Sequence, residues 1–475
     1  MVFTSIPFFL FLLAVLLLYY ILPVNLRKYL LIFASLLFYG ASGPEYLFLV
    51  LFVILFNYFV AAGIDKSPGK KARSVYLYAS LAVNIGILVF YKYLSFILGN
   101  FALLLGLFQE SPEIPLLKLA LPLGISYYTF QNIGYIIDVY RGTQKAEKSV
   151  VNFSLFVLFF PKLNVGPIER ARNLLPQISA EKTFSTVDLV EGSKRILWGF
   201  FKKLVVADRI AIYVDAVFVN YQYHGGLTML LAILLYTLQV YADFSGYTDI
   251  ALGTARLFGF RLMENFNHPL LSKNVSDFWR RWHISLSSWV NDYLYNPISL
   301  KRRYWGNWGI YYALFISFTI IGIWHGATWN YILFGVLQSL ALIYETSTRK
   351  FRKKISRKIP VQAYNGLSIL FTYLFISFAL ILFKTPTPGQ ALDILRSLSY
   401  PSGELSIDRA SMILFLLIGC SILIISDYKS EYKLFSLPDR LGKSWVAQQF
   451  AYAFMLIYIL IAGVFDGGQF IYFQF

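Results

Sequence analysis

YLFLVLFVILFNYFVAAG, residues Tyr46 to Gly63, is a run of eighteen residues without one charged side chain. Two further runs, Phe8 to Leu22 and Leu367 to Phe383, have the same character. A helix needs about 20 mostly apolar residues to cross the hydrocarbon of a bilayer, where backbone polar groups must be satisfied internally. These runs therefore predict helices that span a membrane.

The composition supports the same fold class over the whole chain. Hydrophobic residues make up 57% of the 475 residues and charged residues only 14%, with a mean hydropathy of +0.59. Soluble domains carry about 25% charged residues, so one water-exposed core could not absorb so many apolar runs. We predict an all-α, polytopic integral membrane protein with about ten to twelve membrane segments. The expected segments are 5–23, 26–40, 45–63, 74–97, 116–138, 150–165, 226–245, 308–324, 326–345, 367–384, 411–426 and 447–465.

The net charge of +17 is distributed in short basic clusters between apolar runs. The clusters are Arg27-Lys28, Lys66 to Arg73, Lys202-Lys203, Lys301 to Arg303 and Arg349 to Lys358. This distribution is typical of cytoplasmic loops, with anionic lipid head groups as partners, and it argues against nucleic acid. The N-terminus, Gln109 to Pro115, Thr385 to Asp408 and Phe470 to Phe475 are then expected outside, and Asp427 to Lys443 inside.

The middle of the chain is irregular. Between residues 150 and 303, apolar stretches are interrupted by proline and by charged residues, and such interruptions at membrane depth are tolerated only in buried or cavity-lining backbone. The interruptions are Pro161, Pro167, Asp208-Arg209, Asp243, Pro269 and Arg280-Arg281. We predict one transmembrane domain over 1–475, with N-terminal spans in 1–145, a functional core of broken or re-entrant helices in 150–345 and C-terminal spans in 346–475.

The segment Ile310 to Glu345 contains the first candidate site. It is long enough for two crossings, and both flanks are expected inside, so the chain must reverse within GIWHGATWN, Gly322 to Asn330. His325 lies at this reversal. An ionisable residue placed there indicates a functional site, although a neutral histidine bonded to a loop carbonyl would also fit.

A second candidate site is DFWRRWHISLSSW, Asp277 to Trp289. At helical spacing, one stripe contains Trp282, Leu286, Trp289 and Tyr293, and another contains Arg280, His283 and Ser287. Such a helix suits the membrane interface or a cavity wall, and its two arginines could receive donor phosphates or lipid head groups. His224 and His268 lie in loop-like sequence and are expected to have only loop roles.

A third candidate, YADFSGYTD, Tyr241 to Asp249, ends a long apolar run. Asp243 there requires an Arg or His partner on another helix, unless Asp243 or Ser245 caps a helix N-terminus. The chain has no P-loop, no Gly-rich dinucleotide motif, no Cys/His metal spacing and no G-x-S-x-G elbow. Histidines and hydroxyls are therefore the expected reactive groups, and no metal is expected.

Taken together and in order, these motifs resemble the membrane-bound O-acyltransferases, in particular the bacterial branch that contains the alginate O-acetyltransferases. The resemblance rests on Asn265 to Pro269, Asp277 to Trp289 and Gly322 to Trp329, and it extends to Leu121 to Gln131, Phe159 to Ile168, Asp243 to Thr248 and Phe470 to Phe475. It implies a helical core with a tunnel that joins both membrane faces at the active histidine. One departure is the polar stretch Lys162 to Val165.

The resemblance also implies residue roles. His325 corresponds to the family's invariant histidine and would be the general base, and His283 corresponds to its second characteristic position. Arg280, Arg281, Trp282 and Ser287 would bind the donor, and Asp243, Ser245, Asp277, Trp324 and Asn330 would support the site.

The implied reaction is transfer of an acetyl group from cytoplasmic acetyl-CoA, or another acyl thioester, toward an extracytoplasmic polysaccharide. A periplasmic or extracellular acyltransferase partner would complete it, with no permanently bound cofactor, in the cytoplasmic membrane of a bacterium. The alternatives are D-alanyl transfer from a carrier protein to teichoic acid, and a transporter or flippase that uses His325 as a proton relay.

Overall fold

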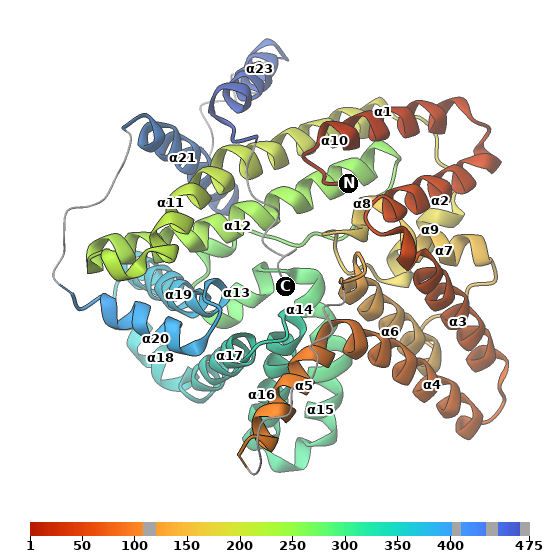
Figure 1. The fold of residues 1–475 in the computed structure, drawn as a ribbon, viewed down its shortest axis with the longest axis horizontal. Helices are drawn as coiled ribbons and strands as arrows, with labels where there is room; N and C mark the ends of the chain where they lie inside the picture. The colour runs from red at the N-terminus through yellow and green to blue at the C-terminus, as the bar shows by residue number, and fades with distance from the viewer. Residues whose placement is uncertain (108–119, 401–409, 434–444, 466–475) are drawn as a thin grey trace. The chain divides into compact units, whose positions relative to one another are not determined.

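A computed structural model describes residues 1–107, 120–400, 410–433 and 445–465 (Figure 1). Regular structure within these ranges is helical, and none of the described residues forms a strand. The expected outer loop at Gln109 to Pro115 and the ending Phe470 to Phe475 lie outside the described residues, as do parts of Thr385 to Asp408 and of Asp427 to Lys443.

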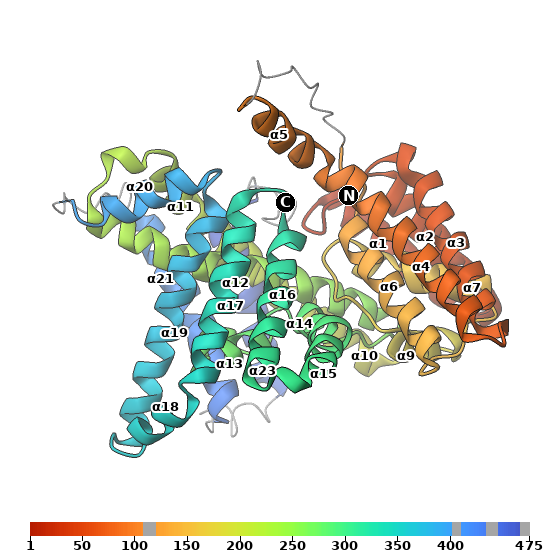
Figure 2. The same ribbon diagram turned by 90° about the horizontal axis from the view of Figure 1, so that it is seen from below.

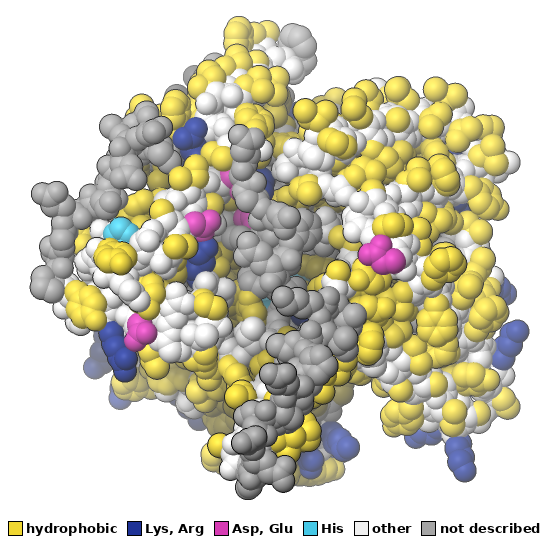
Figure 3. Space-filling view, viewed as in Figure 1, with side chains coloured by type: hydrophobic (Ala, Val, Ile, Leu, Met, Phe, Trp, Pro, Cys, Tyr) yellow, Lys and Arg dark blue, Asp and Glu magenta, His cyan; other side chains and the backbone are white. Residues whose placement is uncertain are grey.

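Five helical segments in the described chain are long and apolar enough to cross a membrane. They are Pro44–Lys66, Lys70–Leu105, Gly226–Leu257, Asn307–His325 and Val361–Lys384, and shorter apolar helices occupy Ile6–Ile21 and Val446–Ala462. Many large apolar side chains are exposed, and yellow areas cover much of the face seen in Figure 3. The prediction of an all-α, multi-pass membrane protein is therefore confirmed.

The described chain divides into two compact units. The first, here called the N-terminal unit, contains Met1–Ser193 and Ala251–Met263; the second, the C-terminal unit, contains Lys194–Ile250 and Glu264–Phe475. Several predicted segments each fall inside one helix of these units, namely 26–40, 226–245, 308–324, 367–384 and 411–426.

The N-terminal unit is a helical bundle. Its helices are α1 (Ile6–Ile21), α2 (Val24–Gly40), α3 (Leu47–Lys66), α4 (Lys70–Leu88), α5 (Leu94–Leu105), α6 (Ile125–Arg141), α7 (Val150–Leu158), α8 (Phe160–Leu163) and α9 (Ala171–Ser179). Figure 2 shows α1 to α4 and α6 side by side. A buried polar cluster joins α3 to α4, because Asn57 Oδ1 accepts hydrogen bonds from Ser80 Oγ at 2.8 Å and from Asn84 Nδ2 at 2.9 Å.

The predicted segment 150–165 is interrupted near Pro161, as expected for the irregular middle of the chain. Helix α7 ends at Leu158, and Phe159 has an extended ψ of 106° before the short α8 begins. Pro161 has no N–H for a continuous helix, and the N–H of Phe160 instead donates to Ser35 Oγ of α2 at 3.1 Å.

The C-terminal unit contains the remaining helices of the described chain, except for residues 251–257 at the end of α12, which belong to the N-terminal unit. Helix α10 (Thr186–Phe200) begins in the N-terminal unit. It continues without a break into the π-helical segment η3 (Phe201–Ala207) and then into α11 (Asp208–Val219). The others are α12 (Gly226–Leu257), α13 (Val275–Arg281), α14 (Ile284–Val290), α15 (Asn296–Lys301), α16 (Asn307–His325), α17 (Trp329–Ser347), α18 (Arg349–Ser356), α19 (Val361–Lys384), α20 (Pro388–Ser397), α21 (Ala410–Tyr432) and α23 (Trp445–Ala462).

The interpretation of Lys202-Lys203 as a cytoplasmic loop cluster is wrong. Both lysines are buried in η3, where Lys203 Nζ lies 2.7 Å from Asp208 Oδ1 and 2.7 Å from Asp243 Oδ1. Lys202 Nζ similarly lies 2.6 Å from Asp249 Oδ2. Asp243 therefore has the cationic partner that its position required, but the partner is a lysine, and Asp243 lies inside α12 instead of capping it.

Helices α16 and α17 form a tight antiparallel hairpin (Figure 2). A Cβ on Gly322 would lie 2.2 Å from the carbonyl oxygen of Tyr331, and a Cβ on Gly335 would lie 2.4 Å from that of Phe318. Only glycine at both positions permits this backbone approach, and the hairpin fixes where α16 ends.

We expect Gly335→Ala to lower the thermal unfolding midpoint of the purified protein by several degrees. The added methyl would overpack the hairpin, which costs about 1–3 kcal/mol. Gly366→Ala in α19 is the matched control, because a Cβ there meets no atom within 4 Å. Equal midpoints for both variants would contradict the packing argument.

We expect Lys203→Met to lower the free energy of unfolding by about 3–5 kcal/mol, because two buried carboxylates would lose their cation. Thermal unfolding in detergent would measure this loss. Lys301→Met makes the same change at an exposed position of the same unit. A Lys203→Met protein as stable as the Lys301→Met control would rule out the buried cluster as a stabilising element.

Candidate active site

His325 is the last residue of α16, at the predicted reversal of the chain. The reversal is confirmed, since α16 ends at His325 and α17 begins at Trp329. The side chain is buried, with 3% of its surface exposed. An ionisable ring is therefore buried at this position.

The tautomer of His325 follows from its backbone contact. Nδ1 lies 2.7 Å from the carbonyl oxygen of Ile321, one turn earlier in the same helix. A carbonyl oxygen can only accept, so Nδ1 must donate the proton and Nε2 retains the lone pair in the neutral ring. This tautomer presents Nε2 as a base.

Aromatic side chains enclose the imidazole. The ring centroid of His325 lies 5.1 Å from Trp324, 5.1 Å from Phe383 and 6.3 Å from Phe334. Asn330 joins the start of α17 to the end of α19, because its Nδ2 donates to the carbonyl oxygen of Thr385 at 2.6 Å. Asn330 thus supports the end of α19 that carries Phe383.

His283 lies at a break between two short helices. Its backbone is left-handed, with φ of 43°, and it separates α13 from α14. The predicted continuous stripes across Asp277 to Tyr293 are therefore wrong. The break is stabilised by Asn265, whose carbonyl oxygen accepts from the N–H of Ile284 at 2.9 Å and whose Oδ1 accepts from the N–H of Ser285 at 3.2 Å.

Trp324 brings the two histidines together. Its ring lies 5.7 Å from that of His283 and 5.1 Å from that of His325, between centroids. His283 is fully buried and also lies against Phe244 at 4.8 Å. Burial lowers the pKa of His283 well below its usual value, and the charge on a protonated His325 would lower it further. His283 is therefore neutral at physiological pH.

A pocket of about 660 Å³ lies within the C-terminal unit, and its lining includes Ile284, the residue after His283, but neither histidine. Its polar wall includes Arg280, Ser287 and Asn291, and its apolar wall includes Phe318 and Ile321. Ile321 is the residue whose carbonyl accepts from His325, so the pocket reaches within one turn of the candidate base.

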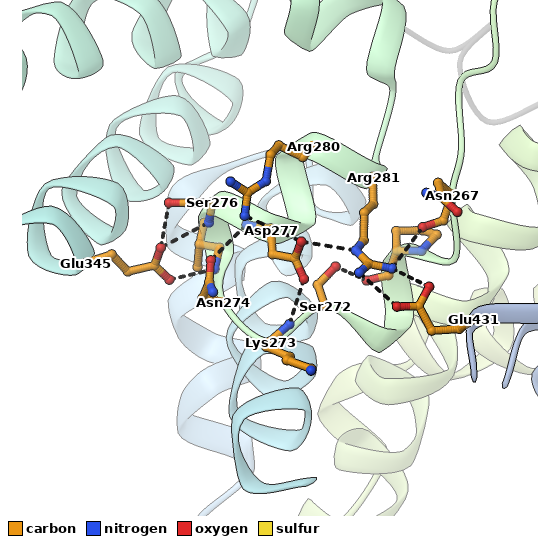
Figure 4. Close-up of polar contacts among 12 residues, drawn as sticks. Asn267, Ser272, Lys273, Asn274, Ser276, Asp277, Arg280, Arg281, Glu345 and Glu431 are labelled. Carbon is orange, nitrogen blue, oxygen red and sulfur yellow. Dashed lines mark hydrogen bonds and ion pairs between the residues drawn. The ribbon is translucent and has the colours of Figure 1, made fainter. Parts of the chain in front are cut away.

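The two predicted donor-binding arginines have different surroundings (Figure 4). Arg281 lies between Asp277, whose Oδ1 is 3.1 Å from its Nε, and Glu431, whose Oε2 is 2.7 Å from its Nη1. The hydrogen bonds from Arg281 lower the pKa of Glu431. Arg280 is 72% exposed and only 3.6 Å from Asp277, so its guanidinium remains accessible at the pocket.

Other predicted site residues have structural surroundings. Trp282 is buried and stacks on Phe278 at 5.3 Å, and Ser287 Oγ donates to the carbonyl oxygen of Trp282 at 3.2 Å. Ser245 lines a separate pocket of about 280 Å³, where Arg195 and Asp249 form an ion pair. Among the described residues, no group of three or more His, Cys, Asp or Glu side chains could hold a metal.

The sequence reasoning missed two carboxylates that position the arginine motif. Glu345, near the end of α17, accepts from the N–H of Val275 at 2.6 Å and from the N–H of Ser276 at 3.0 Å, which caps α13 (Figure 4). Glu431 comes from α21, far along the chain. An acidic residue at the end of an apolar run was the available signal for both.

Comparison with known proteins covers the region that contains this candidate site. The model of the membrane-bound O-acyltransferase family matches residues 146–385, a range that contains both histidines and the pocket. A probable alginate O-acetylase of Pseudomonas putida is 37% identical over 390 residues, which cover 81% of this chain and 77% of the relative.

Two more distant relatives have other acceptors in their names. A peptidoglycan O-acetyltransferase of Helicobacter pylori is 33% identical over 398 residues, with 78% of this chain and 73% of the relative covered. A teichoic acid D-alanyltransferase of Bacillus subtilis is 30% identical over 290 residues, with 58% and 72% covered. The match to the family over 146–385 and the long similarity to O-acetylases show that this chain is an O-acyltransferase of the membrane-bound O-acyltransferase family.

Proposed function

We propose that this protein moves an acetyl group from cytoplasmic acetyl-CoA toward hydroxyl groups of an extracytoplasmic polysaccharide, in the cytoplasmic membrane of a bacterium. The names of the relatives support the acetyl group and a polysaccharide acceptor, since the alginate and peptidoglycan enzymes are both O-acetylases. The D-alanyl relative supports the alternative acyl group less, because it covers 58% of this chain against 81%.

The observation that carries the proposal is the hydrogen bond from His325 Nδ1 to the Ile321 carbonyl. It leaves Nε2 as the basic atom in a buried site beside a pocket that opens to Arg280. A neutral imidazole whose other ring nitrogen carries the lone pair suits general-base catalysis near pH 7.

In the proposed reaction, His325 Nε2 removes the proton of the acceptor hydroxyl as its oxygen attacks the thioester carbonyl. The tetrahedral intermediate then expels the thiolate of CoA, and the imidazolium returns the proton to that sulfur. The products are an oxygen ester and free CoA thiol, and His325 is regenerated as the neutral tautomer.

His283 stabilises developing charge in this proposal. A neutral, fully buried imidazole can donate one hydrogen bond to the negative charge that develops on the carbonyl oxygen. Its contact with Trp324, which also touches His325, would keep both rings at one reacting centre.

The pocket beside α13 and α14 would receive the donor. Its apolar wall suits the extended arm of the thioester, and the accessible Arg280 would pair with a donor phosphate. Arg281, by contrast, would hold α13 in place through Asp277 and Glu431. We also propose a separate extracytoplasmic partner that passes the acetyl group to the polymer, as the family resemblance implies.

We expect His325→Ala to reduce acceptor-dependent release of CoA from acetyl-CoA by about 10²–10⁴-fold, because the general base is lost. The assay would use purified protein in detergent with a polysaccharide acceptor. His224→Ala is the matched control, a histidine of the same unit outside the pocket. Undiminished CoA release by the His325→Ala enzyme would show that His325 is not the catalytic base. If the wild type cleaved a D-alanyl thioester and not acetyl-CoA, D-alanyl would be the acyl group.

We expect Arg280→Gln to raise the KM for acetyl-CoA about tenfold with kcat little changed, because a charge-assisted hydrogen bond to phosphate is lost. An acetyl thioester that lacks the phosphates should show no such change. Arg303→Gln removes an exposed arginine elsewhere in the same unit as the control. An equal rise in KM for both donors would refute phosphate binding by Arg280.

A further inference from the structure

A second pocket, of about 360 Å³, lies entirely within the N-terminal unit and has no part in the proposed reaction. Its basic lining residues are Arg27 and Lys28 at the start of α2 and Lys182 after α9. Segments far apart in the sequence thus bring three cations to one cavity. The charge pattern of the sequence places Arg27-Lys28 on the cytoplasmic side.

All three cations contact neutral groups. Arg27 donates to the carbonyl oxygens of Leu22 at 3.1 Å and of Lys182 at 2.6 Å. Lys28 Nζ donates to Asn152 Oδ1 at 3.3 Å, and Lys182 Nζ lies 5.0 Å from the centre of the Phe260 ring. These contacts position the cations without neutralising them.

Carboxylates near the pocket do not neutralise these cations. None of the ion pairs within the described chain includes Arg27, Lys28 or Lys182. Glu181 lines the pocket but is exposed, and Asp188 is paired with Arg256 at 3.2 Å. The buried lysines of the C-terminal unit, by contrast, each contact aspartate. Asp188 also attracts Lys182, but three cations and one carboxylate in the lining leave the pocket with a net positive charge.

Helix termini add to this positive potential. Val24 and Asn25, the first residues of α2, line the pocket, and no side chain caps the N-terminus of α2. The first turn of α7 also lines the pocket through Val151 and Asn152, but this terminus is capped, because Ser149 Oγ accepts from the N–H of Asn152 at 3.2 Å. Exposed N–H groups and the positive end of the helix dipole make such termini favourable sites for phosphate.

The surroundings of the pocket favour a lipid over a free anion. Tyr29, which lines the pocket, is 58% exposed, and tyrosine is enriched where a membrane meets water. Helix α1 leads to the pocket with apolar residues exposed along it: Leu13 56%, Leu17 57% and Ile21 75%. A head group in the pocket could thus continue into acyl chains along α1.

We propose that Arg27, Lys28 and Lys182 form a site for the phosphate of an anionic phospholipid on the cytoplasmic side of the N-terminal unit. The cations pair with the phosphate, the uncapped start of α2 donates hydrogen bonds to it, and the acyl chains lie against α1. Each Lys or Arg near a membrane surface contributes about one kilocalorie per mole to such binding, so two charges correspond to at least a tenfold change in affinity.

The test is native mass spectrometry of the full chain in a neutral detergent, titrated with phosphatidylglycerol or with phosphatidylcholine of the same acyl chains. We expect the wild type to bind phosphatidylglycerol preferentially. Lys28→Gln with Lys182→Gln should weaken this binding about tenfold or more, and the glutamine amide introduced at position 28 can still donate to Asn152. Lys28→Arg with Lys182→Arg should retain it.

Lys70→Gln with Lys71→Gln is the matched control, which removes two exposed charges from another cytoplasmic segment of the same unit. Equal loss in both double variants would show a general charge effect and overturn the site, as would equal binding of the two lipids. If inorganic phosphate at millimolar concentration displaced the lipid and bound as tightly as the lipid, the proposal that the site holds a lipid would be overturned. Unchanged acetyl transfer in the Lys28 and Lys182 variant would separate this site from the active site.

Discussion

The close approach of α16 and α17 at Gly322 and Gly335 is the constraint on which the site depends. With no side chain at either position, the two backbones meet directly, and the hairpin can reverse within a few residues. His325 occupies the last turn of α16, where its Nδ1 bonds the carbonyl of Ile321. The hairpin thus fixes both the position of the ring and its tautomer.

At His283, backbone N–H groups find their hydrogen-bond partners outside the helix. The helix stops at His283, and Asn265 accepts hydrogen bonds from the two residues that follow. A break in a helix leaves backbone N–H groups without partners in the helix, and Asn265 supplies those partners here. Trp324 then contacts both rings, so a regular hairpin and an interrupted helix meet at one aromatic side chain.

The sequence was sufficient to predict the fold class and the reversal at Gly322 to Asn330, because both depend on local hydrophobicity and on the spacing of basic loops. The catalytic roles of His325 and His283 stay predictions. The sequence could not predict the break at His283, since the hydrogen bonds that cause it come from Asn265. Lys202 and Lys203 were misassigned for a related reason. Their carboxylate partners at Asp243 and Asp249 lie about 40 residues away, and only the folded chain brings the charges together.

The partners of each cation indicate whether that cation stabilises the fold or is available to bind a ligand. Lys203 and Arg281 each contact two carboxylates, and a cation so compensated has little attraction left for a further anion. Arg280 contacts only one, at 3.6 Å, and opens to the pocket beside the histidines. Arg27 and Lys28 bond only to neutral oxygens. An uncompensated cation in a concave site attracts phosphate, so Arg280, Arg27 and Lys28 are the cations available to anionic ligands.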